Sequence, residues 1–214
     1  MADRCLLYYI TDRSQFRGDE RARRRDLLAK VAEAARARVD CIQLREKDLS
    51  TRELEMLARE AVVMVRENSS LTRLLINSRT DVALAAGADG VHLRADDVGP
   101  REARQAAHRP LSTDHFLVAA SCHSNEEVIR ADSEGADFAV FGPIFGKNNA
   151  PGRQPTGPAA LHEACRAKIP VLALGGVTME NAASCLEAGA AGVAGIRLFQ
   201  ENKIEDVVRA LRAL

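Results

Sequence analysis

Short runs of apolar, β-branched and aromatic residues alternate with longer segments of helical periodicity along the whole chain. This alternation is typical of repeated βα units around a parallel sheet. The predicted strands lie at Leu6–Ile10, Cys41–Arg45, Leu74–Ile76, Gly90–Leu93, Leu117–Ser121, Phe138–Phe141, Val171–Leu174 and Val193–Ile196. Eight such strands in 214 residues predict one α/β domain, residues 1–214, folded as a single (β/α)8 TIM barrel.

Local signals support these boundaries. Ser50 with Glu53, and Ser124 with Glu127, have the Ser-x-x-Glu spacing of a helix capping box. Three similar segments each place a helix-ending glycine just before a strand, and these glycines are Gly87, Gly135 and Gly189. This internal repetition favours one barrel over two domains.

The charge balance disfavours several classes of function. Lys plus Arg and Asp plus Glu number 30 each, so the chain lacks the net positive charge that nucleic acids or anionic membranes attract. No apolar run has the length of a membrane span or of a signal-peptide core. The five cysteines are scattered without metal-ligand spacing, which fits a reducing compartment. We therefore expect a cytoplasmic protein with no nucleic-acid or membrane partner, and the sequence leaves a homo-oligomer open.

One connection is unusually long. Residues Pro143–Gly157 include three prolines and three glycines and show no periodicity. This segment follows the sixth strand on the face where barrel enzymes bind their substrates. We interpret it as a mobile lid, with a plain surface loop as the alternative.

Polar residues occupy most of the strand ends at that face, where the active site of a barrel enzyme lies. A ring of polar residues around one mouth is hard to explain by packing alone, so we expect a ligand pocket there. The residues concerned are Thr11, Gln43, Arg45, Asn77, His92, Ser121, His123, Gly175 and Gly176.

The segment after the second strand is the most highly charged part of this ring. Strand alternation directs Gln43 and Arg45 into the barrel mouth, and Lys47 follows two residues later. An arginine fork and a lysine point charge together suit phosphate or pyrophosphate oxygens. The alternative is a surface ion pair, either of Arg45 with Glu46 or of Lys47 with Asp48.

Glycines after the last two strands predict a phosphate site. Gly175 and Gly176, after the seventh strand, leave main-chain N–H groups free to approach an anion. Gly195, at the eighth strand, offers a second stretch of accessible main chain on the other side of the same site. TIM barrels recurrently bind phosphate between these loops, and Arg197 adds positive charge. The alternative is a tight turn that needs a positive φ. The expected ligand is a phosphorylated small molecule.

Two histidines lie at strand ends. His123, between Ser121 and Ser124, is the leading acid/base candidate because an imidazole exchanges a proton near neutral pH. The alternative is that it merely neighbours a helix cap. His92 has apolar neighbours, so we expect it to have a structural or ligand-stacking role.

Several motifs, taken in their order and spacing, resemble the thiamin phosphate synthase/TenI family over nearly the whole chain. They are Tyr9-Ile10-Thr11-Asp12, Gln43 through Lys47, Ile76-Asn77, Gly87 through Leu93, Ser121 through Ser124, Phe141 through Phe145 and Gly175-Gly176-Val177. The resemblance implies an enzyme of thiamin biosynthesis. The synthases of this family use magnesium to join a hydroxymethylpyrimidine diphosphate to a thiazole phosphate, with release of pyrophosphate. The TenI-like tautomerases shift a proton within a carboxythiazole phosphate.

The resemblance also implies roles for individual residues. It assigns the diphosphate to Gln43, Arg45, Lys47 and Asn77, the magnesium ion to Asp97, the thiazole phosphate to Gly176, and the acid/base role of the tautomerases to His123.

Four departures from the family pattern bear on the site. Ser78 stands where the synthases have a second magnesium-binding aspartate, which predicts weak binding of Mg²⁺. Lys147-Asn148-Asn149-Ala150 replaces a Thr-x-Thr-Lys stretch that closes over the pyrophosphate. Arg94-Ala95 replaces Gly-Gln, and Arg197 replaces a serine.

These departures set the order of the functional hypotheses. Departure of pyrophosphate needs neutralising charge from metal and cations, whereas proton transfer needs only a positioned imidazole, a phosphate anchor and a pocket. We therefore rank a TenI-like thiazole tautomerase that uses His123 ahead of a divergent synthase. The synthase follows closely, because Lys147, Arg94 and Arg197 could together replace the positive charge of the stretch that closes over the pyrophosphate. A non-catalytic sensor of phosphorylated ligands is the third hypothesis.

Overall fold

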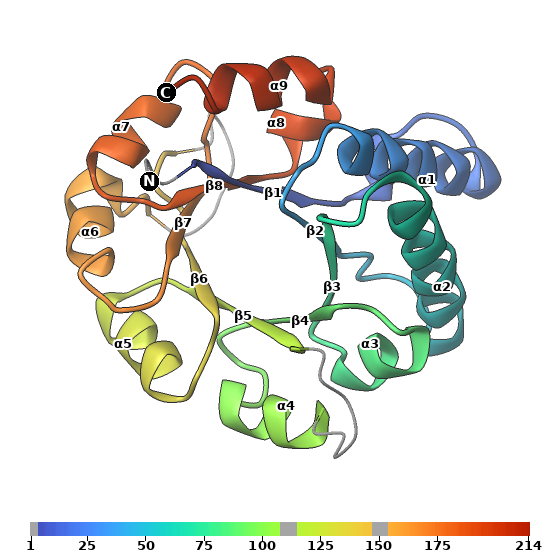
Figure 1. Ribbon diagram of the computed structural model, residues 1–214, viewed down its shortest axis with the longest axis horizontal. Coiled ribbons are helices and arrows are strands. Elements are labelled where there is room, and N and C mark those ends of the chain that lie inside the picture. The colour runs from blue at the N-terminus through green and yellow to red at the C-terminus, as the bar shows by residue number, and fades with distance from the viewer. Residues whose placement is uncertain (1–3, 108–114, 147–153) are drawn as a thin grey trace.

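The computed structural model describes residues 4–107, 115–146 and 154–214. Within these ranges eight strands form a closed parallel barrel, each hydrogen-bonded to its neighbours in chain order and surrounded by helices (Figure 1). The strands are β1 (Leu6–Ile10), β2 (Cys41–Leu44), β3 (Arg73–Asn77), β4 (Gly90–Leu93), β5 (Leu117–Cys122), β6 (Phe138–Phe141), β7 (Val171–Leu174) and β8 (Gly192–Gly195). The predicted (β/α)8 barrel is confirmed, and each predicted strand matches an observed one to within one residue at either end.

Helices lie between the strands and cover the outside of the barrel (Figure 1). They are the short 3₁₀ helix η1 (Arg13–Gln15) and the α-helices α1 (Glu20–Arg36), α2 (Thr51–Asn68), α3 (Thr80–Ala86), α4 (Pro100–Ala107), α5 (Asn125–Ser133), α6 (Gly157–Ala164), α7 (Ala182–Glu187), α8 (Arg197–Gln200) and α9 (Ile204–Leu211). None of the helices in the described ranges is long and apolar enough to cross a membrane.

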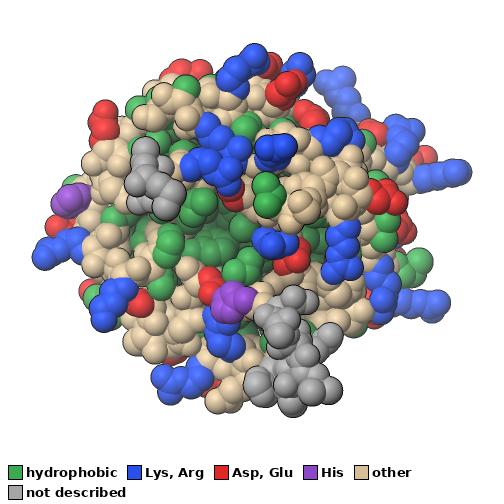
Figure 2. Space-filling model, viewed as in Figure 1, with side chains coloured by type: hydrophobic (Ala, Val, Ile, Leu, Met, Phe, Trp, Pro, Cys, Tyr) green, Lys and Arg blue, Asp and Glu red, His purple; other side chains and the backbone are tan. Residues whose placement is uncertain are grey.

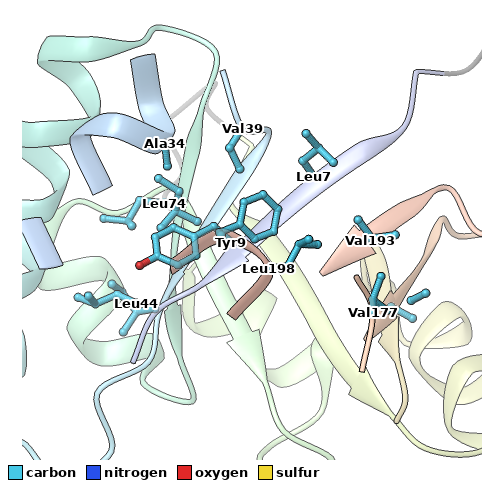
Figure 3. Packing of buried hydrophobic residues seen from close by; sticks show 14 of the residues in the cluster. Leu7, Tyr9, Ala34, Val39, Leu44, Leu74, Val177, Val193 and Leu198 are labelled. Carbon is cyan, nitrogen blue, oxygen red and sulfur yellow. The ribbon is translucent and has the colours of Figure 1, made fainter. Parts of the chain in front are cut away.

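Strand alternation divides the buried side chains between two cores. Tyr8 points into the barrel, whereas Tyr9 points outward, where Figure 3 shows it among Leu7, Ala34 of α1 and Leu198 of α8. Apolar burial of this kind stabilises the fold by about 1.5–3 kcal/mol per large side chain. The inner core consists of Tyr8, Ile10, Leu75, Ala119, Phe138, Val140, Leu172 and Ala194.

The turns that lead from helix to strand follow the prediction. Gly87, Gly135 and Gly189 all have positive φ values, of 70°, 84° and 97°. A left-handed residue ends a helix by turning its main chain, and glycine adopts this conformation without steric cost. The capping box of Ser50 and Glu53 at the start of α2 is also confirmed.

The two faces of the barrel differ. Figure 2 looks onto the face where the strands begin, and apolar side chains occupy its centre with charged side chains around them. The carboxyl ends of the strands, and the predicted ligand site, lie on the opposite face. The fold therefore places the candidate residues around one mouth, away from the apolar end of the barrel.

Candidate active site

Polar side chains from neighbouring strands are hydrogen-bonded at the barrel mouth. Gln43 is almost fully buried, and its Nε2 donates to Oδ1 of Asn77 at 2.9 Å. Asn77 Nδ2 in turn donates to the Ser78 hydroxyl at 3.0 Å. The predicted alternation of this strand is correct, because Leu44 belongs to the outer core while Gln43 faces inward. The sequence-predicted pair Gln43 and Asn77 therefore forms one polar unit across β2 and β3.

His92 is buried inside the barrel and uses both of its ring nitrogens. Nδ1 lies 2.9 Å from the Tyr8 hydroxyl, and Nε2 lies 2.7 Å from the Ser121 hydroxyl. Burial, assisted by the charge of Arg45, lowers the pKa of His92 to about 3, so the ring is neutral at pH 7. The arrangement fits the structural role predicted for His92, because an imidazole this enclosed has no open face for a ligand. It holds the Ser121 hydroxyl in place at the mouth.

A buried arginine from another part of the chain binds the acids that follow β2. Arg13 is 5% exposed, and its Nη1 lies 3.2 Å from Glu46 Oε2 and 2.6 Å from Asp48 Oδ1. The Glu46 carboxylate also accepts hydrogen bonds from the Thr11 hydroxyl at 2.6 Å and from the Arg13 N–H at 3.0 Å. Burial raises the pKa of Glu46, and these hydrogen bonds oppose that effect. Both acids are therefore engaged within the protein.

Arg45 and Lys47 consequently have no ion-pair partner in the described part of the chain, and the alternative of surface pairs with Glu46 and Asp48 is wrong. Burial and then the charge of Arg94 lower the pKa of Arg45, although Asp12 and Glu46 oppose this. The charge of Arg45 is also the main cause that lowers the pKa of Lys47. All three cations follow the carboxyl ends of strands, β2 for Arg45 and Lys47 and β4 for Arg94, and both of these strands pair with β3. We call Arg45, Lys47 and Arg94 the cation cluster, and its role in binding an anion stays a prediction.

Asp97, the predicted magnesium ligand, forms a hydrogen bond and an ion pair with Arg94. Its Oδ2 accepts a hydrogen bond from the Arg94 main-chain N–H at 2.8 Å, and its Oδ1 lies 3.3 Å from Arg94 Nη2. Ser78 offers only a neutral hydroxyl at the position of the missing second carboxylate. Among the described residues, no group of three or more His, Cys, Asp and Glu side chains is arranged to hold a metal ion. This donor set fits a divalent cation poorly, and the role of Asp97 stays a prediction.

His123 is held from two sides at the end of β5. Its Nδ1 is hydrogen-bonded to the carbonyl oxygen of Gly142, and its main-chain N–H donates to Glu127 Oε2 at 2.6 Å. The capping box predicted for Ser124 and Glu127 is therefore only half correct. The Ser124 hydroxyl accepts a hydrogen bond from the Glu127 N–H, as in a capping box. The Glu127 carboxylate, however, accepts from the N–H of His123 and not from that of Ser124. The result is a fixed imidazole that is half-buried beside β6.

The Gly175-Gly176 turn has the conformation that its sequence requires. Their φ values are +95° and +66°, and a Cβ on Gly176 would lie 2.8 Å from the Phe145 carbonyl oxygen. The alternative of a turn that needs positive φ is thus correct for the main chain. The Gly176 N–H makes no hydrogen bond to another described residue, which leaves it available to a ligand. Phosphate binding here stays a prediction.

Gly195 and Arg197 lie on the neighbouring loop. Gly195 ends β8 and pairs with Tyr9, and the exposed Arg197 begins α8. The Arg197 side chain forms no ion pair within the described ranges. Their predicted role, binding a phosphate together with Gly176, is compatible with this position and stays a prediction.

The ends of the long connection after β6 are held together. Thr156 N–H donates to the Pro143 carbonyl at 2.8 Å, and Gly157 N–H donates to the Ile144 carbonyl at 3.1 Å. The middle of the predicted lid, residues 147–153 with Lys147-Asn148-Asn149-Ala150, lies outside the described residues. The lid interpretation stays a prediction.

Sequence reasoning missed three residues that shape the site: Arg13, Tyr8 and Gly142. The inward position of Tyr8 follows from strand alternation, so its contact with a histidine at the mouth could have been anticipated. Nothing in the sequence indicated that Arg13 would bind two acids more than thirty positions away. The Gly142 contact depends on how β5 and β6 lie side by side, which becomes visible only in the folded barrel.

The fold and these residues define a closed barrel with polar and positively charged side chains at its mouth, and comparison with known proteins gives its family. A sequence model described as thiamine monophosphate synthase matches residues 7–199, so the chain belongs to that family and the predicted resemblance is confirmed. A putative thiamine-phosphate synthase of Geobacter sulfurreducens is 42% identical over 211 residues, which cover 97% of this chain and 93% of the relative. Putative thiamine-phosphate synthase 2 of Aquifex aeolicus is 40% identical over 196 residues, or 91% and 97% of the two chains.

A solved structure agrees with the sequence relatives. The thiamine phosphate pyrophosphorylase of Pyrococcus furiosus superposes with a TM-score of 0.79 at 29% identity, covering 99% of this chain and 95% of that one. The similarity therefore spans the whole barrel.

Proposed function

We propose that the protein is a thiamine-phosphate synthase, a transferase that joins a hydroxymethylpyrimidine diphosphate to a thiazole phosphate and releases pyrophosphate. The relatives in Geobacter sulfurreducens and Aquifex aeolicus are named as putative synthases, which favours this reaction over the tautomerase ranked first from the sequence. The observation that carries the proposal is the cation cluster, whose Arg45 and Lys47 form no ion pair with any described residue, while Arg13 binds both neighbouring acids.

The number of anion sites distinguishes the two reactions. A thiazole phosphate carries one phosphate, for which the glycine loops after β7 and β8 are sufficient. The cation cluster, on the side of β2 and β4, would then have no ligand. A diphosphate supplies that ligand, because its higher negative charge matches several cations. Two separate anion sites therefore suit a reaction with two phosphorylated substrates.

In this proposal the side chains act mainly by binding and by electrostatics. The bond between the pyrimidine methylene carbon and the diphosphate oxygen breaks, and its electron pair leaves with pyrophosphate. The thiazole nitrogen then donates its lone pair to the methylene carbon and forms the new C–N bond. The cation cluster stabilises the charge that develops on the leaving group. Gln43 and Asn77 orient the diphosphate side, and Gly176 anchors the thiazole phosphate.

A thiazole tautomerase is the second candidate, and the geometry of His123 favours it. The bond from Nδ1 to a carbonyl leaves Nε2 as the proton-accepting atom, as a general base requires. This candidate needs the single anion site of the glycine loops and leaves the cation cluster without a role.

One experiment separates the candidates. The purified protein is incubated with hydroxymethylpyrimidine diphosphate and thiazole phosphate, and in parallel with carboxythiazole phosphate alone. We expect thiamin phosphate and pyrophosphate to form in equal amounts, and Arg45→Gln to slow their formation about 10- to 100-fold. Arg59→Gln, which removes an exposed arginine of α2, is the matched control. Isomerisation without coupling would contradict the proposal, and binding of both ligands without turnover would favour a sensor.

A further inference from the structure

Arg94 occupies an unusual position directly after β4. Its Nη2 lies 3.1 Å from Asp96 Oδ2 and 3.3 Å from Asp97 Oδ1, so one guanidinium bridges two carboxylates. The loop itself fixes this arrangement, because the Arg94 N–H donates to Asp97 Oδ2 at 2.8 Å and the Asp97 N–H donates to the Arg94 carbonyl at 3.2 Å. One arginine thus engages two carboxylates that could otherwise serve as ligands for a divalent cation.

The remaining donors of Arg94 are open. Its side chain is 48% exposed, whereas that of Asp97 is 13% exposed, so the acid is covered and the guanidinium is not. Nη1 makes no hydrogen bond to any residue in the described ranges. A guanidinium carries five N–H donors in a planar fork, and this one therefore keeps donors for a ligand while its acids hold it in place.

The charge of Arg94 reaches the mouth of the barrel. It contributes to the lowered pKa values of both Arg45 and Lys47, which come from the loop after β2. The pKa of His92, on the strand that leads to Arg94, responds to Arg45 and Asp97 in opposite directions. Arg94 directly follows β4, and both β4 and β2 pair with β3, so Arg94 lies at the same end of the barrel as the two cations assigned to the diphosphate.

We propose that Arg94 is an anion-binding residue of this site, and that it supplies from the chain itself the positive charge that a magnesium ion would bring to a bound diphosphate. The inference rests on the proposed function in taking a diphosphate as the ligand. It follows that the site binds pyrophosphate without a divalent cation. Asp97 then positions the arginine and is no metal ligand.

Titration calorimetry with inorganic pyrophosphate tests this inference on the intact protein, once with EDTA and once with Mg²⁺. We expect the wild-type protein to bind pyrophosphate in EDTA, with an affinity that Mg²⁺ changes by less than about tenfold. Arg94→Ala should weaken binding in EDTA about 10- to 100-fold, the loss typical of one charge-assisted contact. The affinity of Arg94→Lys for pyrophosphate should lie between those of the wild type and Arg94→Ala, because lysine keeps the positive charge but lacks the planar set of guanidinium donors. Arg59→Ala, an exposed arginine of α2, should leave the affinity unchanged.

Asp97→Asn separates a positioning residue from a metal ligand. If Asp97 only positions Arg94, pyrophosphate affinity in Mg²⁺ stays within about tenfold of the wild type or rises, because a nearby negative charge is gone. If Asp97 binds magnesium, affinity falls in Mg²⁺ and is unaffected in EDTA, which overturns the inference. Wild-type binding that requires Mg²⁺ also overturns it, as does an Arg94→Ala variant that keeps its melting temperature and binds like the wild type in EDTA.

The test is independent of turnover. Metal-free binding of pyrophosphate through Arg94 in a protein that forms no thiamin phosphate would support the inference and contradict the proposed function. Formation of thiamin phosphate that depends strictly on Mg²⁺, with no metal-free binding of pyrophosphate, would do the reverse.

Discussion

The Nδ1 atom of His123 donates a hydrogen bond to the carbonyl oxygen of Gly142, which fixes both the orientation and the tautomer of the imidazole. A carbonyl oxygen only accepts, so the proton of the neutral ring lies on Nδ1 and the lone pair on Nε2. This contact makes His123 chemically competent as a base, whether or not the proposed reaction uses one.

Substitution of His123 should reveal which reaction the protein catalyses. Asparagine can keep a donor near the position of Nδ1, but it has no basic nitrogen at the position of Nε2. For a synthase we expect His123→Asn to retain single-turnover rates within about tenfold of the wild type, because the reaction needs no proton acceptor there. For a tautomerase the isomerisation rate should fall about 100- to 10,000-fold. His123→Ala controls for the lost contact to Gly142, and melting temperatures check both variants for folding.

Alanine at Gly176 should destabilise the fold more than alanine at another left-handed glycine. The φ at Gly176 is +66°, and its Cβ would meet the Phe145 Cβ and carbonyl oxygen, each at 2.8 Å. At Gly157 the φ is +77°, but nothing lies within 4 Å of the added atom. We expect Gly157→Ala to cost about 1–2 kcal/mol of unfolding free energy from the conformation alone, and Gly176→Ala to cost more. Urea denaturation measures both, and equal costs would show that the Phe145 contact relaxes freely.

Removal of Arg13 should leave a buried negative charge without its partner. We expect Arg13→Met to lower the free energy of unfolding by about 3–5 kcal/mol, because Glu46 is buried and can no longer pair. Adding Glu46→Gln should recover part of this loss, since it removes the uncompensated charge. Arg25→Met breaks an exposed pair with Asp26 and should cost less than about 1 kcal/mol. A double variant no more stable than Arg13→Met would show that Glu46 carries no buried charge.

The buried histidine should make stability depend on pH. The pKa of His92 is about 3 in the fold, well below its ordinary value of 6.5, so only the unfolded chain binds a proton between these values. Stability should therefore fall as the pH drops from about 6.5 towards 3, by at most about 1.4 kcal/mol per pH unit from this residue. Above pH 7 the residue should contribute no pH dependence. Urea denaturation at several pH values checks this, and His92→Gln should show a shallower acid limb if His92 is responsible.

The sequence was most informative where structure depends on local periodicity. Short apolar runs located β1 to β8, because the strands of the barrel are buried on both faces. Strand alternation then predicted the inward position of Gln43. Left-handed glycines such as Gly87 and Gly189 were equally predictable, since few other residues adopt their conformation.

Pairings between distant segments were not predictable in this way. Arg45 and Glu46 are adjacent in sequence, yet Glu46 binds Arg13, because strand geometry sends consecutive side chains to opposite faces. The ion pair between Arg94 and Asp97 is local in sequence. Its proposed role in binding an anion depends on the cations of the loop after β2, and only the closed barrel places that loop at the same mouth as Arg94. The ion-pair partners of the charged side chains at the mouth could therefore be identified only from the three-dimensional structure.

The seam between β1 and β8 has a consequence for how the chain reaches this fold. Leu6 pairs with Gly192, and a Cβ at that glycine would lie 2.0 Å from the Leu6 carbonyl oxygen. Until β8 has been synthesised and docked, the outer edge of β1 presents unpaired main-chain donors and acceptors, as an exposed edge strand does. Joining segments from opposite ends of the chain also carries a large contact order, which slows folding. The ladder that closes the barrel thus depends on Gly192, because a side chain at this position would collide with β1 and leave its edge unpaired.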